Sequence, residues 1–316
     1  PSLANSFATE LYTGNGGTQS VTTGFKPDFT WTKSRNGVNY HQLFDSVRGA
    51  TKAIESDTTF AESTEPTALT AFDTDGFSLG SSGNVNSSGT TYVAWNWKAG
   101  GTPSINTDGT TTSIVSANQA AGFSIVEYTG PSTLNPGHGL GGTPELIIVK
   151  GTSTTSDWMV YNSFNGTGGY LSFTRNDQGG GTGTDAWQAN ANQFSTVNAT
   201  SFTTSDTGAS VTYIAYCFKS ITGYSKVGTY SGTGAAQTIT TGFQPGFLMV
   251  KSSSHASSWY IVDSARTPNY FLSPNSNAAE YTDSGKITFT SNGFTLGSTS
   301  YNNSGYTWIY LAIKEN

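Results

Sequence analysis

The stretch that decides the fold runs from Tyr12-Thr13-Gly14 to Gly24-Phe25-Lys26-Pro27-Asp28-Phe29-Thr30-Trp31-Thr32-Lys33. The same arrangement returns with Tyr128-Thr129-Gly130 leading to Gly142-Thr143-Pro144-Glu145-Leu146-Ile147-Ile148-Val149-Lys150. It returns again with Tyr230-Ser231-Gly232 leading to Gly242-Phe243-Gln244-Pro245-Gly246-Phe247-Leu248-Met249-Val250-Lys251. From the tyrosine to the lysine the spacing is 21, 22 and 21 residues. A chance match would not keep this spacing, so the chain contains a true internal repeat.

The repeat divides the 316 residues into three units of about 100 residues, the size of a small β-sandwich. We predict repeat one over 1–98, repeat two over 122–220 and repeat three over 221–316. Residues 99–121 are rich in Gly, Thr and Ser and have few bulky apolar side chains. We interpret them as a linker that contributes at most one strand. Without such a spacer, repeats two and three are expected to pack as a rigid pair.

Hydrophobic alternation predicts that the units are all-β, and their size predicts three tandem β-sandwiches. Phe77 and Leu79, and likewise Phe294 and Leu296, alternate with Ser or Thr as in half-buried strands. Apolar residues on both faces of 213–218 indicate a central strand. The Asp-Gly and Asn-Gly pairs before these alternating runs predict tight turns.

Composition excludes several classes of protein. Only 11% of residues are charged, the formal net charge is −6, and the basic residues do not cluster, so we expect no nucleic-acid partner. No apolar run approaches the roughly 18 residues that span a bilayer, so we expect no membrane insertion. The single cysteine, Cys217, lies in an apolar stretch and fits a small core residue better than a nucleophile.

One local motif resembles a binding site. Repeat one has Asp45 and Arg48 three residues apart, and repeat three has Asp263 and Arg266 at the corresponding place. Repeat two has asparagines at both positions, so acid and base are lost together, which indicates that they are partners. Two interpretations stay open: a structural ion pair that pins a strand end, or a polar pocket for a sugar or a neighbouring subunit.

A further candidate ligand-binding residue is Trp187, which follows a Gly-rich loop and is predicted to have no counterpart in the other repeats. An exposed aromatic ring can stack on a sugar ring. Trp158 and Trp259 occupy equivalent positions, so we assign them to the core. The histidines lack metal-ligand spacing and no pair of carboxylates stands out, so we predict no catalytic residue, no metal and no cofactor.

Several further segments carry a resemblance to a known family. They are Gly122-Phe123-Ser124-Ile125-Val126-Glu127-Tyr128-Thr129-Gly130 with the preceding Ser116-Ala117-Asn118, Gly137-His138-Gly139-Leu140-Gly141-Gly142-Thr143-Pro144, Gly223-Tyr224-Ser225-Lys226-Val227-Gly228-Thr229-Tyr230 and Asp263-Ser264-Ala265-Arg266. The chain resembles an uncharacterised tandem-repeat family of tail-fibre-like virion structural proteins of bacteriophages, notably cyanophages and other aquatic phages. The resemblance implies a virion location and β-sandwich units of jelly-roll-like type, and it implies no catalytic residue.

These observations predict a non-enzymatic virion structural protein of the tail-fibre or appendage type that adheres to host-surface glycan. The expected partners are other virion proteins, host-surface polysaccharide and further copies of the chain, with a homotrimer as the expected assembly. One alternative is a capsid decoration protein, which an apolar patch on one flat face would favour. Another is a polysaccharide depolymerase, which would need two carboxylates facing each other across a cleft.

Overall fold

The computed structural model describes residues 3, 5–173, 187–190, 193–205, 210–266, 269–284, 286–297 and 299–314. Strands make up 48% of the structure and helices 2%, in several antiparallel sheets, which confirms the all-β sandwich class. The helices of the described residues are short: α1 (Gly83–Asn86) and the 3-10 helix η1 (Thr299–Tyr301).

Each repeat builds one large sheet. Repeat one uses β1 (Phe7–Thr13), β9 (Thr91–Trp97), β3 (Phe29–Ser34) and β4 (Gln42–Asp45), in that order. Repeat two uses β12 (Phe123–Gly130), β20 (Val211–Phe218), β14 (Leu146–Gly151) and β15 (Trp158–Asn162). Repeat three uses β21 (Ser225–Ser231), β29 (Thr307–Ile313), β23 (Phe247–Ser252) and β24 (Tyr260–Asp263). The common order shows that the sequence repeat is also a structural repeat.

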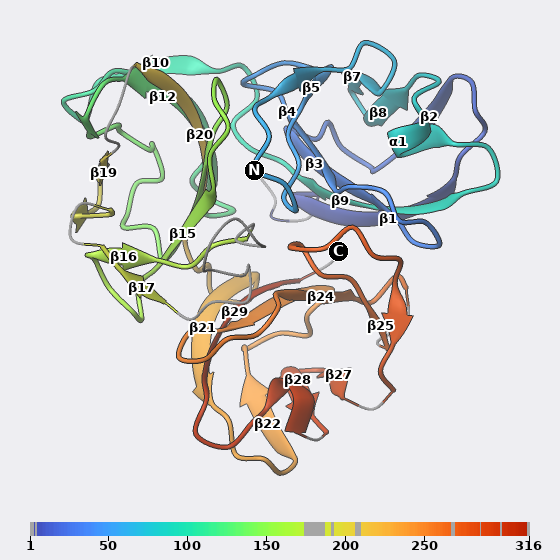
Figure 1. Cartoon of the computed structure of the whole chain (residues 1–316), viewed down its shortest axis with the longest axis vertical. Coiled ribbons are helices and arrows are strands. Elements are labelled where there is room, and N and C mark those ends of the chain that lie inside the picture. Colours follow the sequence, from blue (N-terminus) through green and yellow to red (C-terminus); the bar gives the residue numbers. More distant parts are fainter. Residues whose placement is uncertain are drawn as a thin grey trace.

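A small three-stranded sheet accompanies each large sheet on its outer side (Figure 1). The three small sheets are β2 (Gln19–Thr22), β8 (Gly76–Leu79) and β7 (Leu69–Asp73); β13 (Thr133–Leu134), β19 (Phe202–Ser205) and β18 (Thr196–Val197); and β22 (Gln237–Thr240), β28 (Gly293–Leu296) and β27 (Ile287–Thr290). Each repeat also has one two-stranded ribbon. The ribbons are β5 (Lys52–Ala53) with β6 (Ser63–Thr64), β16 (Gly169–Tyr170) with β17 (Gln188–Ala189), and β25 (Tyr270–Phe271) with β26 (Tyr281–Thr282).

The segment 99–121 is part of repeat two, not a linker outside the sheets. It forms β10 (Ser104–Asn106) and β11 (Ser113–Asn118), and β11 pairs with β12 over its whole length. The two strands widen the second large sheet to six strands. Thr and Ser suit an edge strand with one solvated face, so low hydrophobicity did not prevent pairing.

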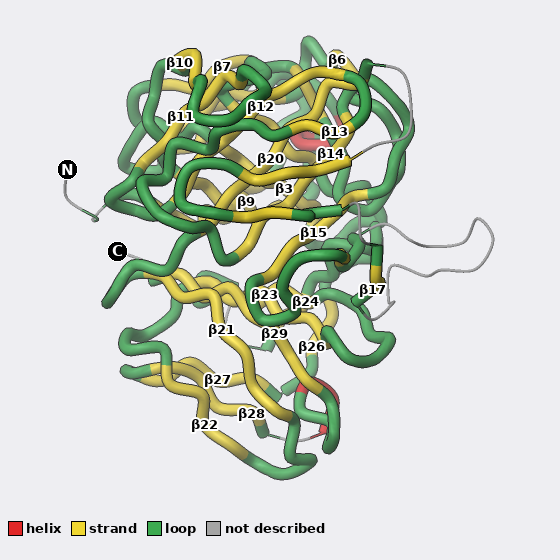
Figure 2. Tube along the Cα trace, turned by 90° about the vertical axis from the view of Figure 1, so that its left-hand side faces the viewer, coloured by secondary structure: helices red, strands yellow, loops and turns green. Residues whose placement is uncertain are grey.

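The inner faces of the three large sheets meet in a single core around a pseudo-threefold axis (Figures 1 and 2). In β14, Leu146 and Ile148 point to this central core, whereas Ile147 and Val149 point to the outer core of repeat two. The strands of the other repeats divide their side chains in the same way. Repeat one therefore packs with the other two, and the three repeats form one body.

The glycine of the predicted Asp75-Gly76 turn has a different role from the one expected. In the hairpin between β7 and β8, Asp73 pairs with Gly76, so the loop residues are Thr74 and Asp75 and the glycine is the first strand residue. A Cβ on Gly76 would collide with the carbonyl oxygen of Val21 in the adjacent strand. The glycine is required by the close approach of two backbones.

Candidate functional site

The predicted site residues lie at the interfaces between repeats, which we name 1/2, 2/3 and 3/1 after the repeats that meet there. Asp45, Asn162 and Asp263 end equivalent strands and pair in register with Phe29, Leu146 and Phe247. The residues at the centre of the neighbouring sheet are also equivalent: Tyr216 at interface 1/2, Leu311 at 2/3 and Trp95 at 3/1.

At interface 1/2, Asp45 and Arg48 form a buried ion pair, with the arginine Nε 2.5 Å from the aspartate Oδ2. The Tyr216 hydroxyl of repeat two donates to the same oxygen at 2.7 Å. Glu62 lies 3.1 Å from the other side of the guanidinium. Burial alone would lower the pKa of Arg48, but Asp45, Tyr216 and Glu62 together raise it above its usual value. The arginine therefore stays charged.

Interface 3/1 repeats this cluster with different donors. The Arg266 Nε lies 2.7 Å from Asp263, and the indole Nε1–H of Trp95 in repeat one donates to that carboxylate at 2.9 Å. Glu280 takes the place of Glu62, 3.5 Å from Arg266, and also binds the guanidinium of Arg35 at 2.9 Å. These contacts confirm that acid and base in the motif are partners, and each pair binds across a repeat interface.

Interface 2/3 replaces every charged member of the cluster. Asn162 and Asn165 stand where the acid and base stand elsewhere, and Leu311 stands where the hydroxyl or indole donor would be. The backbone N–H of Trp187 donates to Ser253 at 2.8 Å, as the backbone N–H groups of the two glutamates do to the corresponding residues at the other interfaces. Trp187 therefore has counterparts after all: it occupies the position of a glutamate and packs against the central core.

Aromatic and imidazole N–H groups link the three repeats in a cycle. The Trp158 Nε1–H donates to the Glu55 carbonyl of repeat one, and the Trp259 Nε1–H donates to the Ser172 carbonyl of repeat two. His41 completes the cycle with its Nε2 3.0 Å from the Ser273 carbonyl of repeat three. Both tryptophans are buried, which confirms their assignment to the core.

The ring nitrogens of His41 have defined roles. The Trp31 Nε1–H donates to the His41 Nδ1 at 2.9 Å, so Nε2 carries the proton and donates to the carbonyl of Ser273. Burial, with the nearby Lys33 ammonium, lowers the pKa of His41 well below its usual value. The histidine is therefore neutral and acts in this cycle as the tryptophans do.

The lysine at the end of each repeated Tyr-to-Lys stretch (Lys33, Lys150 and Lys251) is buried, which was not predicted from the sequence. Lys150 donates to the carbonyls of Gly151 and Ser156 at 3.0 and 2.9 Å, and to Thr59 of repeat one at 3.2 Å. Burial lowers the pKa of Lys150 to about 7 and that of the equivalent Lys33 to about 8. In the sequence, these buried positions are indicated by the recurrence of a lysine at the end of an apolar strand.

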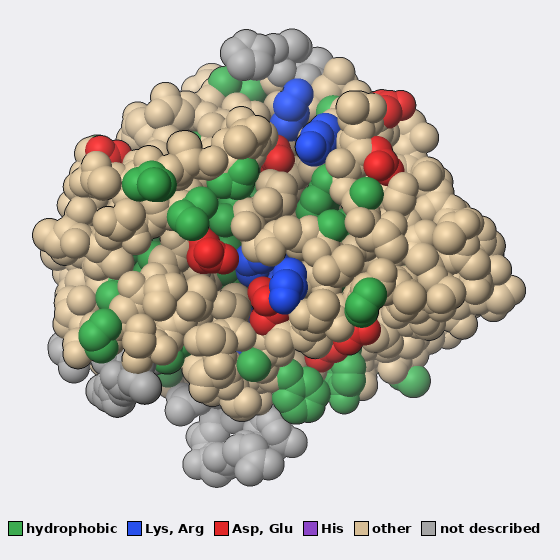
Figure 3. All heavy atoms as spheres, turned by 90° about the horizontal axis from the view of Figure 1, so that it is seen from above, with side chains coloured by type: hydrophobic (Ala, Val, Ile, Leu, Met, Phe, Trp, Pro, Cys, Tyr) green, Lys and Arg blue, Asp and Glu red, His purple; other side chains and the backbone are tan. Residues whose placement is uncertain are grey.

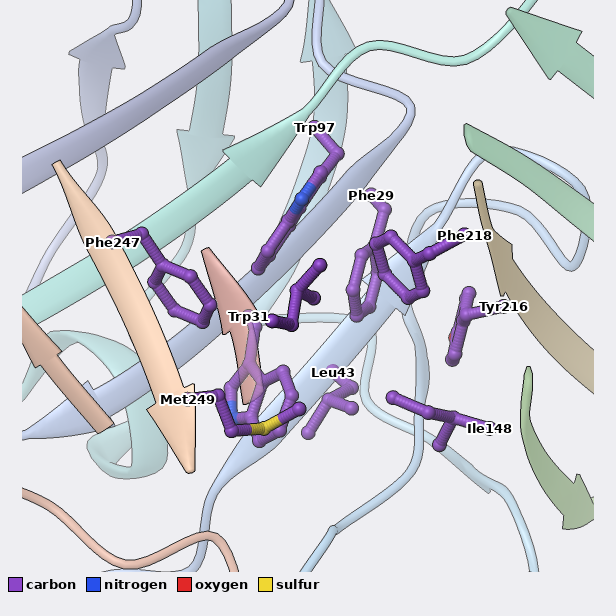
Figure 4. Close-up of a pocket in the computed structure, with 10 residues that line it drawn as sticks. Phe29, Trp31, Leu43, Trp97, Ile148, Tyr216, Phe218, Phe247 and Met249 are labelled. Atoms are coloured by element: carbon purple, nitrogen blue, oxygen red, sulfur yellow. The ribbon is translucent and has the colours of Figure 1, made fainter. Parts of the chain in front are cut away.

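A small cavity lies on the pseudo-threefold axis, lined by residues of all three repeats (Figure 4). Its walls include Trp31 and Trp97 of repeat one, Tyr216 of repeat two and Met249 of repeat three. Its volume of about 10 Å³ is too small for an organic ligand, and the surrounding side chains are apolar. The axis is a packed core and not a channel.

An exposed aromatic pair, which was not predicted from the sequence, lies at interface 1/2. Tyr40 and Phe60 are 42% and 58% exposed, and their ring centroids lie 6.4 Å apart. Phe60 follows Thr59, whose carbonyl accepts hydrogen bonds from the Lys150 ammonium and from the Ser156 backbone N–H. Single aromatic residues in polar loops are common, so nothing in the sequence brought these two together.

An open groove of about 780 Å³ lies beside the segment 99–121. It is lined by Lys26, Asp28, Lys98, Ala99, Gly100, Gly101, Ala117, Asn118, Gln119 and Ala120. One face of the molecule is mostly uncharged: Lys, Arg and acidic side chains appear there only in small groups (Figure 3).

Other chemistry is limited in the described part of the chain. Cys217 lies in the core of repeat two, and burial raises the pKa of its thiol to about 12. Within the described ranges no group of three or more His, Cys, Asp and Glu side chains could hold a metal ion. No helix there has the length and apolar character needed to cross a bilayer.

Comparison with known proteins gives a family without an assigned activity. No curated protein matches the chain. A family described as a domain of unknown function (DUF7483) matches residues 3–316, which include all three repeats and the segment 99–121. The protein therefore belongs to the DUF7483 family.

Proposed function

We propose that this protein is a structural component of a bacteriophage virion, of the tail-fibre or appendage type, and that it adheres to host-surface glycan without enzymatic activity. The observation that carries the proposal is the exposed pair of Tyr40 and Phe60 on a rigid body. Aromatic faces bind the apolar faces of sugar rings, and polar loop groups orient them. Other virion proteins and further copies of the chain, as a homotrimer, are its proposed assembly partners.

The loops that carry the two rings are held before any ligand binds. On one side, the His41 backbone N–H donates to Asp57 at 3.0 Å, directly after Tyr40. On the other, the Glu62 backbone N–H donates to the carbonyl of Thr152 at 2.8 Å, two residues after Phe60. Pre-organised loops lose less entropy on binding, so a small contact area can still give useful affinity. Several copies on one particle would raise it further.

Glycan binding by variants tests the adhesion. Removing both rings with Tyr40→Ala and Phe60→Ala should weaken binding of a host polysaccharide about tenfold, because two stacking contacts are lost. Phe164→Ala is the matched control, since Phe164 is an exposed aromatic residue in repeat two. If the wild-type protein binds no polysaccharide of its host, the adhesion proposal is wrong.

A second candidate function, capsid decoration, is favoured by one observation. Ile105 and Ile114 are cross-strand neighbours on β10 and β11 and are 74% and 41% exposed. An exposed apolar pair on a sheet suits contact with another protein. Immunogold labelling of intact virions separates the candidates: label on the tail supports adhesion, label over the head supports decoration, and no label removes the virion proposal.

A further inference from the structure

We infer that the groove beside segment 99–121 is a second glycan site and that it binds an acidic polysaccharide through the carboxylates of its sugars. This inference rests on the proposed glycan adhesion and names a ligand class for it. The groove volume of about 780 Å³ lies within the usual range of ligand sites, roughly 300–1,000 Å³. Its open form suits a segment of an extended chain.

The two lysines of the groove, Lys26 and Lys98, have exposed side chains without an ion pair or hydrogen bond among the described residues. Most cations of the chain are engaged elsewhere. Carbonyl oxygens hold Lys33, Lys150 and Lys251, and carboxylates hold Arg35, Arg48, Lys52 and Arg266. In a protein of net charge −6, two unpaired cations on one groove are a local feature that attracts anions.

The acid in the groove interacts electrostatically with Lys26 but forms no ion pair with either lysine among the described residues. Asp28 is buried, and its Oδ1 accepts a hydrogen bond from Ser46 at 3.0 Å. Its Oδ2 accepts from the backbone N–H groups of Ala99 and Gly101 at 2.8 and 3.3 Å. Asp28 therefore holds the wall of the groove in place. Burial raises the pKa of this carboxyl, against the lowering effect of these hydrogen bonds and of the nearby Lys26 charge.

The groove is specific to repeat one and the segment that follows it. The repeats place Thr143 and Gln244 at the position of Lys26, so a lysine pair does not recur. The second wall comes from residues 117–120, at the end of β11, which repeats one and three lack. A Cβ on Gly100 would lie 2.5 Å from the Ala117 carbonyl oxygen, so glycine allows this wall to close against the first. Because the groove occurs beside one repeat alone, the fold that the three repeats share does not require it.

The other groups of the groove suit a sugar chain. The Gln119 side-chain N–H donates to the carbonyl of Gly139 at 2.9 Å, which orients the amide at the rim. The walls between are Ala and Gly, so backbone atoms and small side chains face the ligand. Two ammonium groups beside amides and backbone would bind carboxylates of uronic acid units and the hydroxyls between them.

The test compares binding of polygalacturonate, an acidic polymer, with binding of neutral dextran. The variant Lys26→Gln/Lys98→Gln removes both cations from the groove. The control Lys226→Gln/Lys314→Gln removes the same charge elsewhere, including the lysine of repeat three that is equivalent to Lys98. We expect wild type to prefer polygalacturonate. The groove variant should bind it at least about tenfold more weakly, and the control should change by less than about threefold.

The outcomes separate this inference from the proposed function. Equal losses in the groove variant and the control would show that net charge and not the groove binds the polymer, and would overturn the inference. Binding of neutral polysaccharide alone, lost in Tyr40→Ala/Phe60→Ala, would overturn it and leave the adhesion proposal standing. Failure of wild type to bind any polysaccharide would overturn both. A thermal unfolding midpoint equal to that of wild type would show that the groove variant is folded.

Discussion

Arg48 is buried at interface 1/2, where it contacts Asp45, Glu62 and the Tyr216 hydroxyl. At interface 2/3 the equivalent acid, base, glutamate and hydroxyl are all replaced, and the interface is still packed. Complete replacement is tolerated because a buried ion pair contributes little net stability once the cost of desolvation is counted. Loss of one member alone is costly because it leaves a buried charge unpaired. The residues of this cluster therefore vary as a group.

A variant that loses only the arginine should be less stable than one in which acid and base are replaced together. Arg48→Met leaves the Asp45 carboxylate buried without its cation and should lower the free energy of unfolding by about 3–5 kcal/mol. Asp45→Asn/Arg48→Asn copies the acid and base positions of interface 2/3, where the Asn162 side chain accepts a hydrogen bond from the Asn165 backbone N–H at 3.0 Å. The double variant should be the more stable of the two. Equilibrium urea unfolding measures the free energy of unfolding of both variants. If the single variant were the more stable, packing of the long side chain at position 48 would outweigh the cost of an unpaired buried charge.

At the scale of the element, a glycine begins β8 and another begins the equivalent β28. A Cβ on Gly293 would collide with the carbonyl oxygen of Ile239, just as one on Gly76 would collide with that of Val21. In both repeats the glycine pairs with the adjacent strand of the small sheet, Gly76 with Thr22 and Gly293 with Thr240. The strand therefore needs glycine for space, and the positive φ of Gly76 (+157°) and Gly293 (+158°) adds to this need.

Two glycine substitutions in repeat one compare a crowded glycine, Gly76, with an uncrowded one, Gly83. Gly76→Ala should lower the free energy of unfolding by roughly 1–3 kcal/mol, because β2 must move to admit a methyl group. Gly83 in α1 has no atom within 4 Å of an added Cβ and no positive φ. Gly83→Ala should therefore be neutral or stabilise by about 0.4–1 kcal/mol. Urea unfolding of both variants checks this, and equal effects would contradict the role assigned to Gly76.

At the scale of the whole molecule, the three large sheets bury their inner faces in one shared central core. In repeat three, Phe247, Met249 and Leu311 belong to the central core together with residues of the other two repeats. An isolated repeat would expose this face to water, at a cost of roughly 25 cal/mol for each Å² of apolar surface. The outer cores alone are small, so the repeats should depend on one another for stability.

Expression of residues 221–316 alone tests this dependence. We expect the fragment to show no cooperative thermal transition and to lack the near-ultraviolet circular dichroism of packed aromatic side chains. The full chain should unfold in one transition, because its repeats share a core. A fragment that unfolds cooperatively as a monomer would show that each repeat is an independent domain.

The sequence by itself determined the threefold repeat, the all-β class and the partnership of the Asp and Arg residues. These follow from period-two alternation and from the joint loss of Asp and Arg in repeat two, both of which are visible along the chain. Only the tertiary structure decided that the inner faces meet on one axis, that Trp187 replaces a glutamate, and that Tyr40 lies beside Phe60. Period-two alternation predicts which side chains of a strand are buried, but it does not predict which other sheet packs against them. Such contacts join residues far apart in the sequence, and packing of complete sheets selects them.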